Sequence, residues 1–122
     1  MVVAKKLILL VVSDEAYLRS VQKIMDQLGF VIVSALTQIE AIDQFIANQA
    51  IIDLILLDAC VPGKKINTIP LVTFFRRSGF DGLVVGISAD RGYNLQLVES
   101  GASDWCYKNQ VGSKVQELFQ DY

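Results

Sequence analysis

Five short apolar runs alternate with amphipathic stretches along the chain, and this alternation limits the possible folds more than any other feature. The runs are Leu7–Val12, Phe30–Ala35, Leu54–Leu57, Leu83–Ile87 and Trp105–Tyr107. The first, third and fourth consist almost entirely of Leu, Ile and Val, which is typical of strands buried on both faces. Strands that alternate with helices predict an α/β fold in which a parallel sheet lies between two layers of helices.

The stretches between the runs carry the signals of amphipathic helices. A capping box opens at Thr37, with Glu40 three residues later, and Pro70 can begin a further helix. Gly29 and Gly101 are placed to end helices. Five helices are predicted, at 14–28, from 37, from 70, around 94–100 and at 113–120. In the same order, the apolar residues expected to face the core are Leu18, Val21, Met25 and Leu28; Ile39, Ile42 and Ile46; Leu71, Phe74 and Phe75; Leu95 and Val98; and Val115, Leu118 and Phe119.

Length and composition exclude several classes of protein. The 122 residues, of which 52% are hydrophobic and 20% charged, predict one globular domain over residues 1–122. The net charge of −2 argues against a nucleic-acid-binding surface, and the absence of histidine excludes imidazole from any catalytic or metal site. Cys60 and Cys106 are too few for a disulfide framework and are expected to be reduced packing residues. Because no secretory signal or membrane-spanning run is visible, we expect a soluble, cytoplasmic protein without a membrane partner.

Polar side chains close four of the predicted strands. Ser13 and Asp14 follow the first, Asp58 the third, Ser88 the fourth and Lys108 the fifth. The carboxyl ends of parallel strands share one edge of the sheet, where ligands bind in open α/β folds. Carboxylates that meet there favour a hard divalent cation, and oxygen donors without histidine or thiolate favour Mg²⁺. A lysine and a serine beside the ion can bind phosphoryl oxygens, and Asp58 can attack phosphorus to form an acyl phosphate.

These segments resemble the receiver domain of two-component response regulators, the family with the fold of the chemotaxis protein CheY. The resemblance covers nearly the whole chain, and four motifs appear in the family's order: LILLVVSDEAYLR, DLILLDACVPG, GISA and SGASDWCYK. It implies a doubly wound, flavodoxin-like α/β fold with five helices and a five-stranded parallel sheet in the order 2-1-3-4-5.

The resemblance also implies a phosphorylation switch. Asp58 would accept a phosphoryl group from a histidine kinase or a phosphotransfer protein in a two-component phosphorelay. The cofactor Mg²⁺ would be held by Asp14, by Asp58 and by the backbone carbonyl of Cys60, and Ser13 could hold it through a water molecule.

The remaining motif residues would read the phosphoryl group. Lys108 and Ser88 would contact it, and Ser88 and the strand-end aromatic Trp105 would form the switch. A downstream output protein would then bind the altered surface. The implied role is that of a signalling domain that acts through protein contacts, not of an enzyme.

The sequence departs from the family at several positions. Ser13 stands where an acid is usual, which removes a negative charge and predicts weaker Mg²⁺ binding. Asn109 follows Lys108 where the family usually has proline, so the lysine could be aimed differently. The stretch from Ser88 to Gly101 is shorter than is common, and Trp105 replaces the more frequent tyrosine or phenylalanine.

Structural explanations compete with each functional one. Asp58 could merely terminate a strand, Asp14 could be a helix N-cap, and Ser88 could be an ordinary strand-closing serine. Lys108 could be a solvated lysine and Trp105 a static, half-buried aromatic residue. The pairs Lys64-Lys65 and Arg76-Arg77 are expected to be solvated charges.

Two alternative functions also stand beside the phospho-accepting receiver. The first is a pseudo-receiver, in which the same fold serves as a docking module that does not depend on phosphorylation. The second is a small phosphatase with an aspartate nucleophile. This enzyme is disfavoured because Cys60, and not an acid, stands two residues after Asp58.

Overall fold

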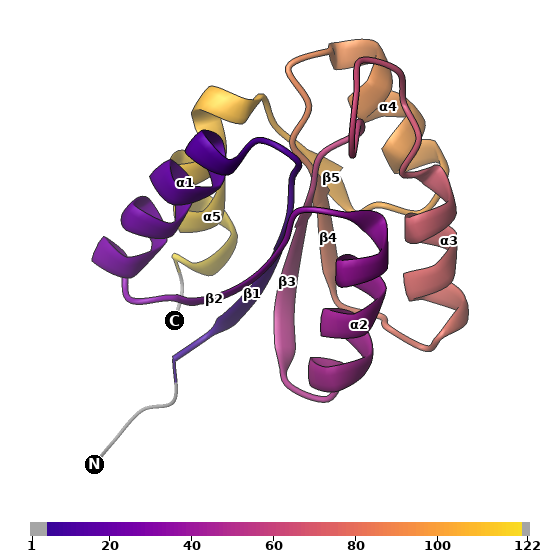
Figure 1. Cartoon of the computed structure of the whole chain (residues 1–122). Helices are drawn as coiled ribbons and strands as arrows, with labels where there is room; N and C mark the ends of the chain where they lie inside the picture. Colours follow the sequence, from indigo (N-terminus) through magenta and orange to yellow (C-terminus); the bar gives the residue numbers. More distant parts are fainter. Residues whose placement is uncertain (1–4, 121–122) are drawn as a thin grey trace.

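Five parallel strands form a single sheet whose order is β2-β1-β3-β4-β5 (Figure 1). The computed structural model describes residues 5–120. The strands are β1 Leu7–Val11, β2 Val31–Ala35, β3 Ile52–Leu57, β4 Leu83–Gly86 and β5 Asp104–Trp105. The helices are α1 Glu15–Gln27, α2 Gln38–Asn48, α3 Ile69–Arg77, α4 Arg91–Glu99 and α5 Val111–Phe119, and a short 3₁₀ helix, η1, covers Lys108–Gln110. The predicted doubly wound α/β fold with five helices is confirmed.

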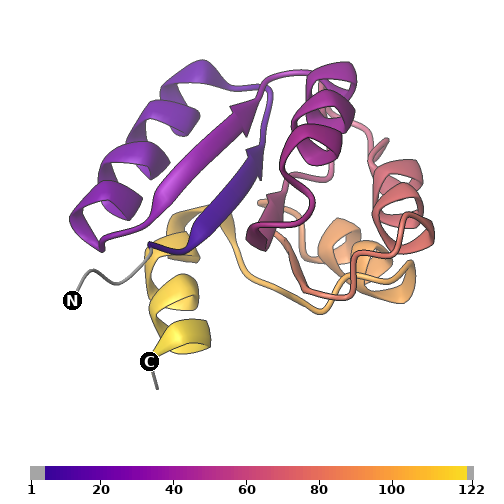
Figure 2. The same cartoon turned by 90° about the horizontal axis from the view of Figure 1, so that it is seen from below.

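The helices form two layers, one on each face of the sheet. Helices α1 and α5 cover one face, and α2, α3 and α4 cover the other (Figures 1 and 2). Strand β1 serves both layers, because its residues alternate between the two sides: Ile8 packs with the α1 and α5 cluster, and Leu9 packs with the α2–α4 cluster. Both residues are fully buried, as the near-continuous apolar run predicts. Within residues 5–120, no helix combines the length and the apolar character that crossing a bilayer requires.

The capping signals of α1 and α2 are confirmed in part: Thr37 caps α2, whereas the Glu40 carboxylate of the predicted capping box accepts from the N–H of Leu36 at 3.1 Å. Thr37 is the N-cap of α2, and its side chain accepts a hydrogen bond from the backbone N–H of Glu40 at 3.1 Å. Gly29 follows the C-cap of α1 with φ +87°, a backbone conformation that glycine adopts without strain.

The predicted apolar stripe of α2 is wrong. Ile39 and Ile46 are 74% and 64% exposed, and Ile42 is only partly buried. The buried residues of α2 are instead Ala41 and Phe45. Phe45 determines the rotation of the helix because its ring packs against three aromatic rings, those of Phe74, Phe75 and Phe80, at centroid distances of 5.6, 4.8 and 5.8 Å.

Helix α4 also differs from the prediction in its start and its rotation. It begins at Arg91, and the Asp90 side chain caps it by accepting from the N–H of Tyr93 at 3.1 Å. The residues that face the core are Asn94 and Leu97, whereas the predicted Leu95 is 37% exposed. Asn94 faces inward because its amide is fully hydrogen-bonded to backbone groups of the sheet edge.

Other differences concern element ends. Strand β5 covers residues 104–105, whereas residues 105–107 were expected. Helix α5 begins two residues earlier than predicted, and its buried residues are Val111 and Val115.

Arg76 is a structural residue, and its interpretation as a solvated charge is wrong. Its guanidinium donates to the backbone carbonyls of Phe80, Gly82 and Gly101 at 3.0, 2.7 and 2.9 Å. Through these bonds α3 holds the segments that precede β4 and β5. One cation therefore links α3 to two further chain segments and satisfies three of their backbone carbonyls.

Candidate functional site

The predicted site residues gather around one cavity at the carboxyl ends of the strands, the upper end of the sheet in Figure 1. Its volume is about 380 Å³. It is lined by Ser13, Asp14, Asp58, Cys60, Gly63, Lys64, Ser88, Ala89, Asp90, Tyr93 and Lys108. All the predicted phosphoacceptor, phosphoryl-contact and metal residues are therefore at one place, whereas Trp105 is not among the lining residues.

Asp58 and Lys108, which both line this cavity, form an ion pair. The Nζ of Lys108 lies 2.8 Å from Oδ2 of Asp58, and the two side chains are 32% and 6% exposed. The pairing explains how a carboxylate can lie almost buried at the end of an apolar strand.

The backbone of Asp58 is also fixed on both sides. Its N–H donates to the carbonyl of Val11 in β1 at 3.0 Å. Its carbonyl accepts from the buried Thr68 hydroxyl at 2.8 Å. The carboxylate is thus presented by a rigid strand end, which is the arrangement that a reacting group needs.

Asp14 has a structural role that is compatible with metal binding. It is the N-cap of α1, where its Oδ1 accepts from the N–H groups of Ala16 and Tyr17 at 2.9 and 3.2 Å. The cap uses one carboxylate oxygen, so the other, Oδ2, can face a cation. The prediction that Asp14 is a helix N-cap is therefore confirmed. Its role as a metal ligand stays a prediction.

The oxygen donors that line the cavity fit Mg²⁺, although they include few carboxylates. Among residues 5–120, no group of three or more Asp, Glu, Cys or His side chains is arranged to hold a metal ion. The cavity nevertheless offers the carboxylates of Asp14 and Asp58 and the hydroxyl of Ser13. Mg²⁺ in proteins commonly uses one or two carboxylates and takes its other ligands from water and phosphate oxygens. Asp14, Asp58, the Cys60 carbonyl and, through water, Ser13 would hold such an ion, with Ser13 in place of a third carboxylate.

Ser88 is held close to the cavity by its own turn. Its Oγ accepts from the N–H of Asp90 at 3.0 Å, and the residue is 4% exposed. The same Asp90 caps α4, so the serine, the turn and the helix start form one unit.

Asn94 was missed by the sequence analysis although it organises this edge of the site. It is fully buried. Its Oδ1 accepts from the N–H of Ser88 at 2.8 Å, and its Nδ2 donates to the carbonyls of Ser88 and Cys106 at 2.9 and 3.2 Å. Asn94 thereby connects the Ser88 turn to the segment that follows β5. A polar residue three positions before the buried Leu97, on the same helix face, was the only signal in the sequence.

Tyr93 and Asp90 were also missed. The Tyr93 hydroxyl donates to the carbonyl of Lys64 at 3.3 Å and so joins α4 to the β3–α3 loop at the edge of the cavity. Asp90 adds a carboxylate to the lining. Lys64, interpreted as a solvated charge, is exposed and also lines the cavity.

The β3–α3 loop, which forms one wall, is fixed by two amide side chains. Asn67 accepts from the N–H of Val61 at 2.8 Å and donates to the carbonyl of Pro62 at 2.9 Å. Gln38, the first residue of α2, donates to the carbonyls of Val61 and Asn67 at 2.8 and 3.2 Å. Four backbone groups of the wall next to Asp58 are therefore satisfied by side chains in place of a regular element.

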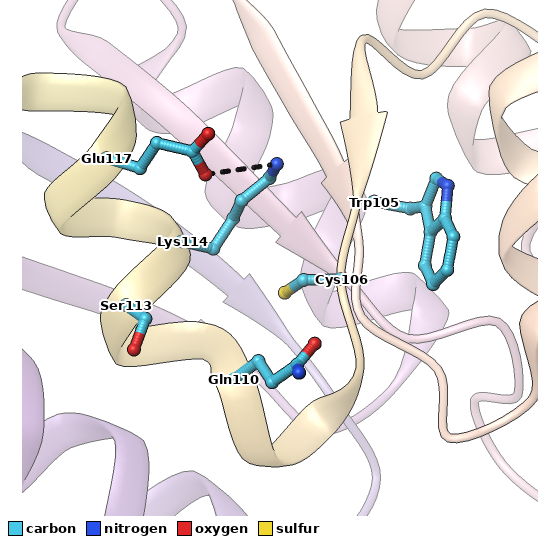
Figure 3. Close-up of a pocket in the computed structure, with 6 residues that line it drawn as sticks. All are labelled: Trp105, Cys106, Gln110, Ser113, Lys114 and Glu117. Atoms are coloured by element: carbon cyan, nitrogen blue, oxygen red, sulfur yellow. Dashed lines mark hydrogen bonds and ion pairs between the residues drawn. The ribbon is translucent and has the colours of Figure 1, made fainter.

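Trp105 lies on β5, on the opposite side of the strand from Cys106 (Figure 3). It is partly buried, and its ring makes an edge-on contact with Tyr107 at a centroid distance of 5.1 Å. This conformation is compatible with a switch and with a static aromatic residue, so its switch role stays a prediction.

A second cavity, of about 320 Å³, lies between β5 and α5 (Figure 3). The Nζ of Lys114 crosses it to reach Asp104 at 2.6 Å and Glu117 at 3.4 Å. The hydrogen bond with Asp104 raises the pKa of Lys114 above its ordinary value. Burial raises the pKa of the Cys106 thiol from 9.0 to about 11, so this cysteine is a neutral packing residue at physiological pH.

Comparison with known proteins defines the class of fold. No protein-family profile and no curated protein sequence matches the chain. Solved structures do match it: a two-component response regulator from Clostridium difficile is 20% identical, with 95% of this chain and 97% of that chain covered and a TM-score of 0.79. The fold is therefore that of CheY-like response regulator receiver domains, as the sequence motifs predicted.

Two further structures have the same fold and were solved with ligands. The response regulator TrrA from Thermotoga maritima, in complex with Mg²⁺ and BeF, is 23% identical, with 93% and 99% coverage and a TM-score of 0.79. The CheX–CheY–BeF₃–Mg²⁺ complex from Borrelia burgdorferi contains a chain that is 21% identical, with 93% and 89% coverage and a TM-score of 0.80. At these identities the likeness defines the fold, and the role of each side chain has to be argued from the cavity itself.

Proposed function

We propose that residues 1–122 form a single receiver domain that takes a phosphoryl group onto Asp58 from a histidine kinase or a phosphotransfer protein. Residues 1–4 and 121–122 lie outside the described part of the chain, so the domain limits rest on the sequence. The observation that carries the proposal is the ion pair of Asp58 with Lys108, 2.8 Å long, in the cavity that Asp14 and Ser88 also line.

The proposed reaction is a direct transfer to the carboxylate. One oxygen of Asp58 bonds to phosphorus as the bond between phosphorus and the donor histidine nitrogen breaks, and the released imidazole takes up a proton. Bound Mg²⁺ would supply charge neutralisation for the phosphoryl oxygens. Lys108, already beside the carboxylate, is placed to bind the same oxygens.

Signalling would then pass from the phosphoryl group to the surface. A hydrogen bond from the Ser88 hydroxyl to the phosphoryl group would move the Ser88 turn. Asn94 links this turn to the carbonyl of Cys106, the neighbour of Trp105. A change in the turn can therefore alter the β5 region, where a downstream output protein would bind. A cytoplasmic location, as expected from the sequence, is part of this proposal.

The proposal is tested by phosphorylation in vitro. Wild type, Asp58→Asn and the control Asp43→Asn are incubated with Mg²⁺ and a small-molecule phosphodonor and then analysed by intact mass spectrometry. Asp43 is an exposed acid on α2, away from the cavity-lining residues. Wild type and Asp43→Asn should gain one phosphoryl group that hydroxylamine removes, and Asp58→Asn should gain none. A gain that persists in Asp58→Asn would identify a different acceptor.

A docking module that works without phosphorylation is the second candidate, and Ser13 is the observation that favours it. A hydroxyl in place of a carboxylate leaves the cavity with one negative charge fewer for a cation. Wild type that stays unmodified, under conditions in which a known receiver is modified, would support this candidate. Repeating the reaction with Ser13→Asp distinguishes the two: if charge alone limits Mg²⁺ binding, this variant becomes modified at lower Mg²⁺ than wild type.

A further inference from the structure

Tyr17 contacts Lys108 at two places, although the two residues are 91 positions apart. Its hydroxyl donates to the backbone carbonyl of Lys108 at 2.7 Å. Its ring lies beneath the ammonium group of the same residue, with Nζ 5.3 Å from the ring centroid. One side chain of α1 therefore touches both the backbone and the charged end of the lysine that pairs with Asp58.

Besides its ion pair with Asp58, the flexible Lys108 side chain gains a second constraint from Tyr17. It is the first residue of the short helix η1, and its side chain is 32% exposed on a stem with four rotatable bonds. The next residue is Asn109, which lacks the ring by which proline fixes its own φ. The orientation of the Lys108 backbone therefore depends on contacts from elsewhere in the fold, and Tyr17 supplies one from α1.

The Tyr17 hydroxyl is a dependable donor. Burial, with smaller contributions from Cys106 and Asp58, raises the pKa of Tyr17 above its ordinary value of 10.0. A phenol of ordinary pKa already carries its proton at physiological pH, and the raised pKa extends this to more alkaline pH, so the hydroxyl can donate to the carbonyl. Tyr17 lies in the first turn of α1, where its N–H donates to the capping carboxylate of Asp14 at 3.2 Å, so its position is set by a residue of the same cavity.

We propose that Tyr17 is the positioning residue that directs the Lys108 ammonium toward Asp58. This inference rests on the proposed function for its effect on phosphorylation, but its effect on Lys108 does not. Removing the hydroxyl should leave the acceptor unchanged and lower the rate of transfer, because the ammonium would leave the Asp58 oxygen part of the time. Removing the ring as well should lower the rate further, because the cation–π contact is also lost.

The test compares Tyr17→Phe, which keeps the ring, with Tyr17→Leu, which keeps neither contact. Tyr107→Phe is the matched control. It also removes a tyrosine hydroxyl, from the residue that precedes Lys108, but it leaves the two contacts between Tyr17 and Lys108 in place. The rate of Asp58 modification by a small-molecule phosphodonor with Mg²⁺ should fall roughly tenfold in Tyr17→Phe, as for one lost hydrogen bond. It should fall more in Tyr17→Leu and stay at the wild-type value in Tyr107→Phe.

A second readout follows Lys108 directly, without phosphorylation. In wild type, the ¹³C and ¹H resonances of the Lys108 ε-methylene should be shifted by the Tyr17 ring and distinct from those of exposed lysines. In Tyr17→Phe they should move toward the values of exposed lysines, and in Tyr17→Leu they should reach them. Backbone NMR spectra and thermal unfolding of each variant show whether the fold is retained, so that a misfolded variant is not scored.

The outcomes separate this inference from the proposed function. If wild type is never phosphorylated but the Lys108 resonances respond as described, the positioning role stands and the phospho-acceptor role fails. If Tyr17→Phe is phosphorylated at the wild-type rate and leaves the Lys108 resonances unchanged, the positioning role is wrong.

Discussion

The side chain of Asn94 is the clearest case in which one residue determines the geometry of the site. Its amide is fully buried, and all three of its hydrogen bonds go to backbone groups of Ser88 and Cys106. A buried polar group without partners is costly, so the two backbone segments and the amide require one another. The position of Ser88 in the cavity therefore depends on a residue of α4.

Replacing Asn94 should lower stability and disturb the site together. We expect Asn94→Ala to lower the free energy of unfolding by about 2–3 kcal/mol, because buried backbone groups lose their partners. The exposed Asn109 provides the control, and Asn109→Ala should change stability by less than about 0.5 kcal/mol. Urea unfolding monitored by circular dichroism measures both values. Equal stability of the two variants would show that the Asn94 bonds contribute nothing net.

At the scale of the helix, α2 has two apolar faces and buries only one. Ala41 and Phe45 face the core, whereas Ile39 and Ile46 remain in water. The side chain with the larger packing surface determines the rotation, and here this is the aromatic ring of Phe45.

Substitutions on the two faces of α2 should therefore differ sharply in cost. Phe45→Ala should destabilise the fold by about 3–5 kcal/mol, because it removes a ring that packs against three others and leaves a cavity. Ile39→Ala, at 74% exposure, should change stability by less than about 0.5 kcal/mol. Thermal or urea unfolding of the two variants checks this. Similar losses in both would mean that the helix is rotated differently in solution.

The strands, helix α2 and two residues of the site show how far the sequence predicts this structure. Strands β1, β3 and β4 could be predicted because buried parallel strands are continuous apolar runs, and Asp58 and Lys108 could be brought together because parallel strands end at one edge. Helix rotation could not be predicted for α2, whose spacing supports two faces. Tyr17 and Asn94 were not predicted for a related reason. Whether a helix side chain reaches the cavity depends on the rotation of the helix about its axis, and packing determines that rotation.

At the scale of the whole molecule, stability should decline at alkaline pH through Cys106. Burial raises its pKa from 9.0 to about 11, so between these values the folded protein keeps a proton that the unfolded chain releases. The free energy of unfolding therefore decreases as pH rises above about 9, by at most about 1.4 kcal/mol per pH unit from this group. Below pH 9 the thiol is protonated in both states and adds no pH dependence.

Denaturant unfolding of wild type and Cys106→Val at pH 8 and pH 10.5 isolates this contribution. Lysines and tyrosines also titrate in this range, but they are common to both proteins. The loss of stability between the two pH values should be smaller in Cys106→Val. An identical loss in both would show that the thiol ionises equally easily in the folded and the unfolded chain.

The sheet separates the apolar interior into two clusters that lie on opposite faces, one under α1 and α5 and the other under α2, α3 and α4. Because the two clusters are separate, the effects of substitutions in one on stability should add to the effects of substitutions in the other. Each half can consequently accumulate changes in volume without compensation from the other. The two sides of such a domain are free to diverge at different rates, with the shared strands as the common constraint.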